Sequence, residues 1–112
     1  MENKAYEILM TLEFEKQFNR LDVKEQGRIR KAIQGLKSNP YTGKPLGYEF
    51  FREKKIGGNR LYFLIYENFA VVFLITFGGK KTQKETIARI KGELPEYKAE
   101  VEKAVKGLRQ TF

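Results

Sequence analysis

Basic side chains stand at the ends of the expected strands, in a pattern suited to binding phosphate. The stretch FREKKI carries Arg52 and Lys54, RLYFLIY opens with Arg60, and the apolar run AVVFLITFGG is followed by Lys80 and Lys81. Antiparallel strands can bring Arg52, Lys54 and Arg60 onto one exposed surface, with the two later lysines emerging from the strand next door. Such cations bind phosphate oxygens and would stabilise the added negative charge of a phosphorane, while Lys54 or Lys80 would accept the proton of a ribose 2′-hydroxyl. The pattern therefore predicts metal-independent RNA cleavage with these five residues as the catalytic set.

Four further side chains extend the expected site along an RNA strand. Lys55 is the next residue after Lys54, and Tyr62 lies where its ring can stack a base. Arg28 and Lys31 fall on the basic face of an expected helix, where they would grip RNA phosphates. Each residue also has a purely structural interpretation, because exposed basic side chains often only protect a sheet edge and Tyr62 suits cross-strand packing.

The composition limits the possible chemistry. The chain has 112 residues with no cysteine and no histidine, so disulfides and Cys-rich zinc sites are excluded and the commonest metal ligand is missing. Neither a metal nor a cofactor is expected, and catalysis would use Lys, Arg, Tyr, Asp or Glu. The net charge of +8 favours a polyanionic partner, although a merely soluble basic protein has the same signature.

The sequence gives no sign of a membrane protein. The N-terminal MENKAYEILM carries acidic residues and lacks the apolar core of a signal peptide. The longest apolar run, FAVVFLITF at 69–77, is far too short to cross a bilayer. A cytoplasmic protein without a membrane partner is therefore expected.

Hydrophobic periodicity predicts the elements that would position the basic residues. AYEILMTLEF alternates like a half-buried strand, and a short helix with Phe14, Phe18 and Leu21 follows. Asp22 caps a second helix, whose buried stripe is Ile29, Ala32, Ile33 and Leu36. The stretch YTGKPLG is expected to be a turn-rich connection. Strands at 48–56 and 60–67 form a hairpin around the turn GGN, and 69–77 is a third, central strand.

Helices are expected to complete the chain. Thr82 and Glu85 resemble a capping box for a helix carrying Ile87, Ile90 and Leu94, and Pro95 opens a C-terminal helical extension at about 95–112. The order β-α-α-β-β-β-α, with this extension, predicts one α+β domain over residues 1–112, in which helices pack on a small, mostly antiparallel sheet.

The ordered set of motifs resembles the RelE/ParE superfamily of toxins from type II toxin–antitoxin systems. The resemblance covers roughly residues 6–94 and rests on QGRIRKAIQGLKSNP, GKPL and FREKKIGGNRLYFLIYENFAVVFLITFGGKKTQKETIARI, whose last part is similar to the HigB-like branch. It implies the RelE-like fold and a toxin that cleaves mRNA on the ribosome until a small antitoxin wraps around it. By position, Arg52 resembles the basic residue of the family's second strand, Arg60 the arginine that opens the third, and Lys81 the basic residue after the fourth.

The chain also departs from the family's pattern. Ile87 stands near the place where RelE-like members carry a tyrosine, and the C-terminal histidine of HigB-like members has no counterpart. Two alternatives therefore stay open: a ParE-like inhibitor of DNA gyrase, and a non-catalytic nucleic-acid-binding module of the same fold. If the chain is a toxin, whether a ribonuclease or a gyrase inhibitor, the expected partner is an antitoxin with an apolar segment and an acidic rim.

Overall fold

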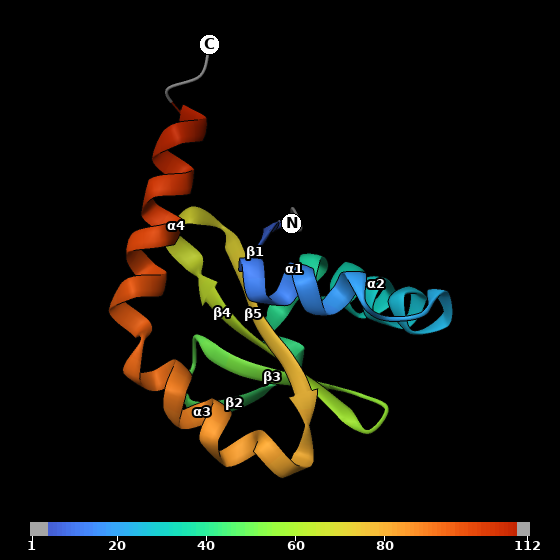
Figure 1. The fold of residues 1–112 in the computed structure, drawn as a ribbon. Helices are drawn as coiled ribbons and strands as arrows, with labels where there is room; N and C mark the ends of the chain where they lie inside the picture. The colour runs from blue at the N-terminus through green and yellow to red at the C-terminus, as the bar shows by residue number, and fades with distance from the viewer. Residues whose placement is uncertain (1–4, 110–112) are drawn as a thin grey trace. The chain divides into compact units, whose positions relative to one another are not determined.

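The computed structural model describes residues 5–109, which fall into two compact units. The first ends at Lys80 and contains a five-stranded sheet with two helices; the second begins at Lys81 and also contains two helices (Figure 1). The predicted single domain over the whole chain stays a prediction.

The sheet of the first unit has the strand order β1-β5-β4-β3-β2. β1 runs parallel to β5, and every other neighbouring pair is antiparallel, which confirms the predicted α+β class with a mostly antiparallel sheet. β5 has a partner on both sides, so the prediction of a central strand in FAVVFLITF is confirmed. The bounds are β1 Glu7–Met10, β2 Lys44–Tyr48, β3 Phe51–Ile56, β4 Asn59–Tyr66 and β5 Val71–Gly79.

Two sequence predictions about the strands were wrong. Most of the edge strand β2 lies in the stretch YTGKPLG, which was expected to be a connection. The sequence does not reveal this strand, because Pro45 and Gly47 interrupt the alternating pattern and only Leu46 is buried. Proline is tolerated there because an edge strand has one unpaired side. β1 also ends at Met10, whereas the alternating pattern had continued through Leu12, which is 64% exposed and begins the first helix.

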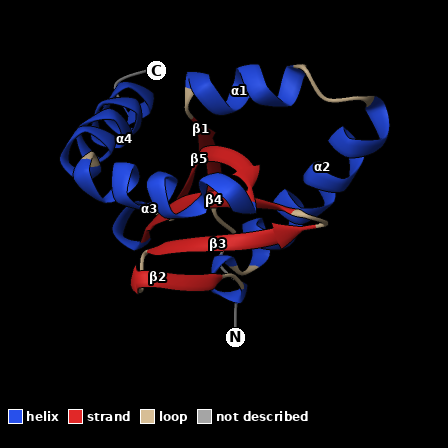
Figure 2. Ribbon diagram, turned by 60° about the horizontal axis from the view of Figure 1, so that its bottom comes forward, coloured by secondary structure: helices blue, strands red, loops and turns tan. Residues whose placement is uncertain are grey.

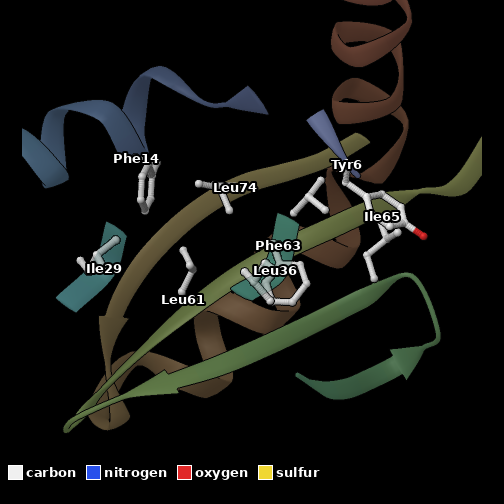
Figure 3. Packing of buried hydrophobic residues seen from close by; sticks show 9 residues of the cluster. Tyr6, Phe14, Ile29, Leu36, Leu61, Phe63, Ile65 and Leu74 are labelled. Carbon is white, nitrogen blue, oxygen red and sulfur yellow. The ribbon is translucent and has the colours of Figure 1, made fainter. Parts of the chain in front are cut away.

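Helices α1 (Leu12–Asn19) and α2 (Val23–Ser38) lie over the same face of the sheet (Figure 2). The Thr11 hydroxyl accepts a hydrogen bond from the Phe14 amide at 3.0 Å, and the predicted Asp22 cap is confirmed by its 2.8 Å bond from the Glu25 amide. Both caps satisfy helix amides that would otherwise lack a partner. The core between helices and sheet is shown in Figure 3; it contains Tyr6, Phe14, Ile29, Leu36, Leu61, Phe63, Ile65, Val72 and Leu74.

α1 also fixes the end of β5. The pairing of β4 with β5 shifts between Tyr62 and Phe63, so that Ile75 is an extra residue of a β-bulge. The Thr11 hydroxyl donates to the Ile75 carbonyl at 2.6 Å, and the Gln17 amide group bonds both the N–H and the carbonyl of Phe77 at 3.0 Å. A bulge bends its strand and redirects the residues after it, so α1 sets the direction in which the chain leaves β5.

A cluster of two tyrosines and a carboxylate ties together three segments of the first unit. Tyr6 precedes β1, Tyr41 lies in the 3-10 turn η1 (Pro40–Thr42), and Glu67 lies in the turn η2 (Glu67–Phe69) between β4 and β5. The Tyr6 hydroxyl donates to both carboxylate oxygens of Glu67 at 2.8 and 2.9 Å, and the Tyr41 hydroxyl donates to Oε2. Burial, and then the bond to Glu67, raises the pKa of Tyr6 to about 12 and also raises the pKa of Tyr41.

We expect this cluster to make the stability fall at high pH. The unfolded chain loses its tyrosine protons near pH 10, whereas Tyr6 keeps its proton in the folded chain up to about pH 12. The folded state then binds more protons, so the free energy of unfolding should decrease as the pH rises from about 10 to about 12. Urea denaturation across this range should show a shallower decrease for Tyr6→Phe. The control Tyr48→Phe, at an exposed tyrosine outside the cluster, should keep the full decrease; a wild-type stability that is flat over the range would contradict the prediction.

The second unit contains α3 (Gln83–Gly92) and α4 (Leu94–Arg109), preceded by the turn η3 (Lys80–Thr82). The predicted capping box was wrong: Thr82 has φ −102° and ψ 7°, continuing the turn, and its side chain makes no capping hydrogen bond. Pro95 lies in the first turn of α4, as expected, and the Tyr97 hydroxyl donates to Glu93 at the junction at 2.7 Å. Residues 110–112 of the predicted extension lie outside the described residues. Between residues 5 and 109, no helix combines the length and the apolar character needed to cross a membrane.

Candidate nucleic-acid interface

The β3–β4 hairpin places the basic residues on faces that differ from the predicted ones. Ile56 pairs with Asn59, so the turn consists of Gly57 and Gly58 alone, one residue fewer than the predicted turn GGN. Shortening a turn by one residue moves each side chain of one strand opposite a different partner and so changes which residues share a face. Arg60 therefore lies opposite Lys55.

The predicted surface made of Arg52, Lys54 and Arg60 is consequently wrong. Arg52 pairs with Phe63 and Lys54 pairs with Leu61, both of which point into the core under the helices. Arg60 shares the opposite face with Lys55 and with the pair formed by Glu53 and Tyr62. The two arginines are also buried, with 7% and 8% of their surfaces exposed, whereas an exposed surface was expected.

Arg52 uses its guanidinium to bind the protein's own backbone. Nε donates to the Gly43 carbonyl, one terminal nitrogen to the Glu49 carbonyl and the other to the Tyr41 carbonyl, each at 3.0 Å. The same group lies 5.4 Å from the centre of the Tyr41 ring, and Glu49 Oε2 is 3.4 Å away. This geometry joins β3 to the segment before β2 and leaves the donor fork little capacity for a substrate phosphate.

Arg60 belongs to a buried polar cluster with Glu53 and Tyr62. Arg60 Nε lies 3.1 Å from Glu53 Oε2, but its N–H is not aimed at that oxygen, so the contact is an ion pair without a hydrogen bond. Among residues 5–109 the buried Tyr62 hydroxyl has no hydrogen-bond partner, and burial followed by the Glu53 charge raises the pKa of Tyr62. The Tyr62 ring is only 1% exposed, so it is not presented for base stacking.

Exposed basic side chains gather at the end of the sheet that carries the hairpin turn. We call this region the hairpin end; it comprises residues 55–60, residues 78–80 and Arg28. Lys55 is exposed opposite Arg60, and Arg60 in turn pairs with Gly78. The next pair joins Asn59 to Gly79, directly before the exposed Lys80. Lys55 and Lys80 thus stand near two glycines at the end of β5, and exposed cations of this kind can bind a phosphate backbone.

Arg28 reaches the hairpin end from α2. A Cβ atom on Gly57 would lie 3.0 Å from an Arg28 terminal nitrogen, and Gly57 has φ +64°. Glycine is thus required at this turn both for its backbone conformation and for the close approach of the arginine. The structure places Arg28 beside the hairpin turn at Gly57, a proximity that the sequence reasoning did not foresee.

The other predicted site residues lie elsewhere. Lys31 is exposed on α2, Lys54 is half-buried on the helix-covered face, and Lys81 is the exposed first residue of the second unit. Their assigned roles stay predictions. The sequence analysis did not identify Glu53. Its signal was nevertheless present, because Glu53 lies in the middle of one predicted strand and Arg60 begins the next, which permits an ion pair across the hairpin. Among residues 5–109, no group of three or more carboxylates is arranged to hold a metal ion.

Comparison with solved structures identifies the fold. The free form of a mutant Escherichia coli toxin RelE matches with a TM-score of 0.64 and 22% identity, covering 77% of this chain and 98% of that one. The intact E. coli RelBE toxin–antitoxin complex matches with a TM-score of 0.61 and 22% identity, covering 67% of this chain and 96% of that one. The Mycobacterium tuberculosis RelBE2 complex matches with a TM-score of 0.60 and 20% identity, covering 68% of this chain and 99% of that one. No known family profile and no curated protein matches the sequence. The described chain therefore has the fold of the RelE toxins.

Proposed function

We propose that this chain is the toxin of a type II toxin–antitoxin system and that it cleaves mRNA on the ribosome. The observation that carries the proposal is the coincidence of a RelE-like fold with a cluster of exposed cations at the hairpin end. Several of the similar structures are toxins bound to an antitoxin, which supports an antitoxin as the partner of this chain as well. The cytoplasm is the proposed location.

The proposed reaction needs only side chains of this chain. Of the two exposed lysines Lys55 and Lys80, one is a neutral amine that accepts the proton, and the other holds the scissile phosphate as an ammonium group, with Lys81 as the next cation along the chain. The 2′-oxygen of the ribose attacks phosphorus and its proton passes to the neutral amine, while the bond to the 5′-oxygen breaks and that oxygen takes up a proton from the ammonium group of the other lysine. The products are a 2′,3′-cyclic phosphate and a 5′-hydroxyl. The cations stabilise the phosphorane, which carries more negative charge than the substrate.

The register changes the choice of lysine within this proposal. Lys55 lies opposite Arg60, whereas Lys54 lies opposite the core residue Leu61. Lys55 therefore replaces Lys54 as the proposed proton acceptor on β3, with Lys80 as the other candidate. Arg60 contributes its charge from beneath the surface, and Arg52 supports the fold rather than the substrate.

We expect the wild-type chain, expressed without an antitoxin, to produce new mRNA 5′ ends inside translated codons. Purified variants Lys55→Ala, Lys80→Ala and Lys81→Ala should each cut mRNA on programmed ribosomes about tenfold more slowly or worse, because each removes either the proton acceptor or a cation that stabilises the developing phosphorane. All three residues are exposed, so the variants should keep the wild-type circular dichroism. Lys37→Ala, at the far end of α2, removes the same charge and should cut normally.

Other results of these experiments would favour a different function for the chain. Growth arrest with intact mRNA would favour the ParE-like alternative, which a gyrase supercoiling assay then tests directly. Normal growth with full-length mRNA would remove the toxin proposal and leave a nucleic-acid-binding module. Unchanged cutting by all three lysine variants would reject the hairpin end as the catalytic site.

A further inference from the structure

A small pocket lies between α2 and the hairpin turn, and its polar side chains lack partners. Its volume is about 120 Å³. Glu25 and Arg28 line it from α2, and Asn59 and the two turn glycines line it from the hairpin. Ile29, Ile56 and Phe77 complete the lining but contribute little of its exposed surface. Within residues 5–109, the side chains of Glu25, Arg28 and Asn59 make no hydrogen bond and no ion pair. The exposed lining of the pocket is mostly polar, and these three groups are available to a ligand.

The size of the pocket limits what it can hold. Sites for drug-sized ligands occupy about 300–1,000 Å³, so a pocket of about 120 Å³ takes a phosphate or one flat ring system rather than a whole nucleotide. Because the exposed lining is mostly polar, its charged and hydrogen-bonding groups decide which of the two it takes.

The charges discriminate further between the two. Arg28 supplies a fork of donors, whereas the Glu25 carboxylate only accepts hydrogen bonds and would repel a phosphate. The ligand must therefore present acceptors and donors side by side. Guanine does so, because O6 and N7 accept from an arginine fork while N1–H and the N2 amino group donate to a carboxylate. Adenine and cytosine each offer a carboxylate a single amino group.

We infer that this pocket binds a guanine base of single-stranded RNA, with Arg28 and Glu25 as the specificity-determining residues. The inference rests on the proposed function, because the RNA would be the strand whose phosphates contact the hairpin end. The pocket shares Arg28, Asn59 and the glycine turn with that region. A guanine held there would bias cleavage toward phosphates near a guanosine.

Binding of short RNAs to the full chain tests the inference. Fluorescently labelled 2′-O-methyl RNA hexamers cannot be cut through the 2′-oxygen, and uridine hexamers with one central guanosine or one central adenosine differ in a single base. Anisotropy titrations should show the guanosine hexamer binding about fivefold more tightly or better. Arg28→Gln should abolish this preference, and Glu25→Gln should abolish it without weakening the binding of all-uridine RNA. The matched control Lys37→Gln should keep the preference.

Two results would overturn the inference. One is equal affinity of the wild-type chain for the guanosine and adenosine hexamers. The other is a Glu25→Gln variant that binds every RNA more tightly and still prefers guanosine, which would mean that the pocket holds a phosphate.

Nuclear magnetic resonance separates this inference from the proposed ribonuclease function. 5′-GMP, but not 5′-UMP, should shift the amide signals of Gly57 and Gly58 and the ring signals of Phe77. Such shifts in a chain that cuts no mRNA would support the pocket and reject the ribonuclease. Cutting without any effect of GMP would support the ribonuclease and reject the pocket.

Discussion

Arg60→Ala is expected to lower the free energy of unfolding by about 3–5 kcal/mol, because it removes one partner of a buried ion pair. Glu53 is 3% exposed, and the Arg60 guanidinium lies 3.1 Å from its carboxylate. Without this cation the buried carboxylate loses this ion pair, which favours opening of the hairpin toward water. Urea denaturation followed by far-ultraviolet circular dichroism measures the loss.

A double variant shows whether the ion pair causes the effect. Glu53→Gln combined with Arg60→Gln removes both charges and should recover a substantial part of the stability lost by Arg60→Ala. Lys55→Ala, directly across the hairpin from Arg60, is the matched control and should change stability by no more than about 0.5 kcal/mol. If Arg60→Ala unfolds at the wild-type urea concentration, the pair does not support the fold.

Loss of toxicity in Arg60→Ala has two possible causes, a missing contact to the phosphorane or an unfolded hairpin. The folded double variant, assayed for mRNA cutting beside the exposed variants Lys55→Ala and Lys80→Ala, separates them. Slow cutting by the double variant would assign Arg60 a role in the reaction beyond stability.

Arg52→Ala is expected to destabilise the chain by about 2–4 kcal/mol. The substitution removes the donors to three carbonyls, those of Gly43, Glu49 and Tyr41. An unsatisfied buried acceptor costs about 1–3 kcal/mol, and the bond to Gly43 is the fully buried one of the three. Water can form hydrogen bonds to the part-buried carbonyls of Glu49 and Tyr41, so the lower limit of the expected loss of stability is about 2 kcal/mol.

The conservative substitution makes this test specific. Arg52→Lys keeps the charge but cannot donate in three fixed directions, so most of the loss should remain. Lys44→Ala, an exposed residue on the neighbouring strand β2, should leave stability nearly unchanged. Amide hydrogen exchange should speed up in β2 and at residues 40–43 in both Arg52 variants. Full retention of stability in Arg52→Lys would show that charge, not the donor fork, is what matters.

The exposed and buried cations of the hairpin therefore have different roles. Arg52 and Arg60 are buried and hold backbone or carboxylate groups of the protein. Lys55 and Lys80 are exposed and carry the proposed contacts to RNA. An RNA-binding surface built from lysines on a scaffold of buried arginines can lose a surface charge without losing the fold.

The sequence by itself determined the order of the main elements and the character of most of them. Asp22 followed by Glu25 predicted the start of α2, and Ile29 and Leu36 predicted its buried face, because a cap and a helical apolar period are local properties. The apolar residues of β5 likewise predicted a strand with neighbours on both sides. β2 was missed because an edge strand with one buried residue has almost no local pattern.

Only the tertiary structure decided which basic residues meet. The sequence GGN permits a turn of two or of three residues, and the pairing of Ile56 with Asn59 selects two. That single residue puts Lys55 opposite Arg60 and turns Arg52 and Lys54 to the other face, since side chains alternate along a strand. The Glu53–Arg60 ion pair depends on that two-residue turn and on the strand pairing it fixes. The pocket beneath Arg28 arises where α2 packs against the hairpin, and no local pattern encodes it because these segments are distant in sequence.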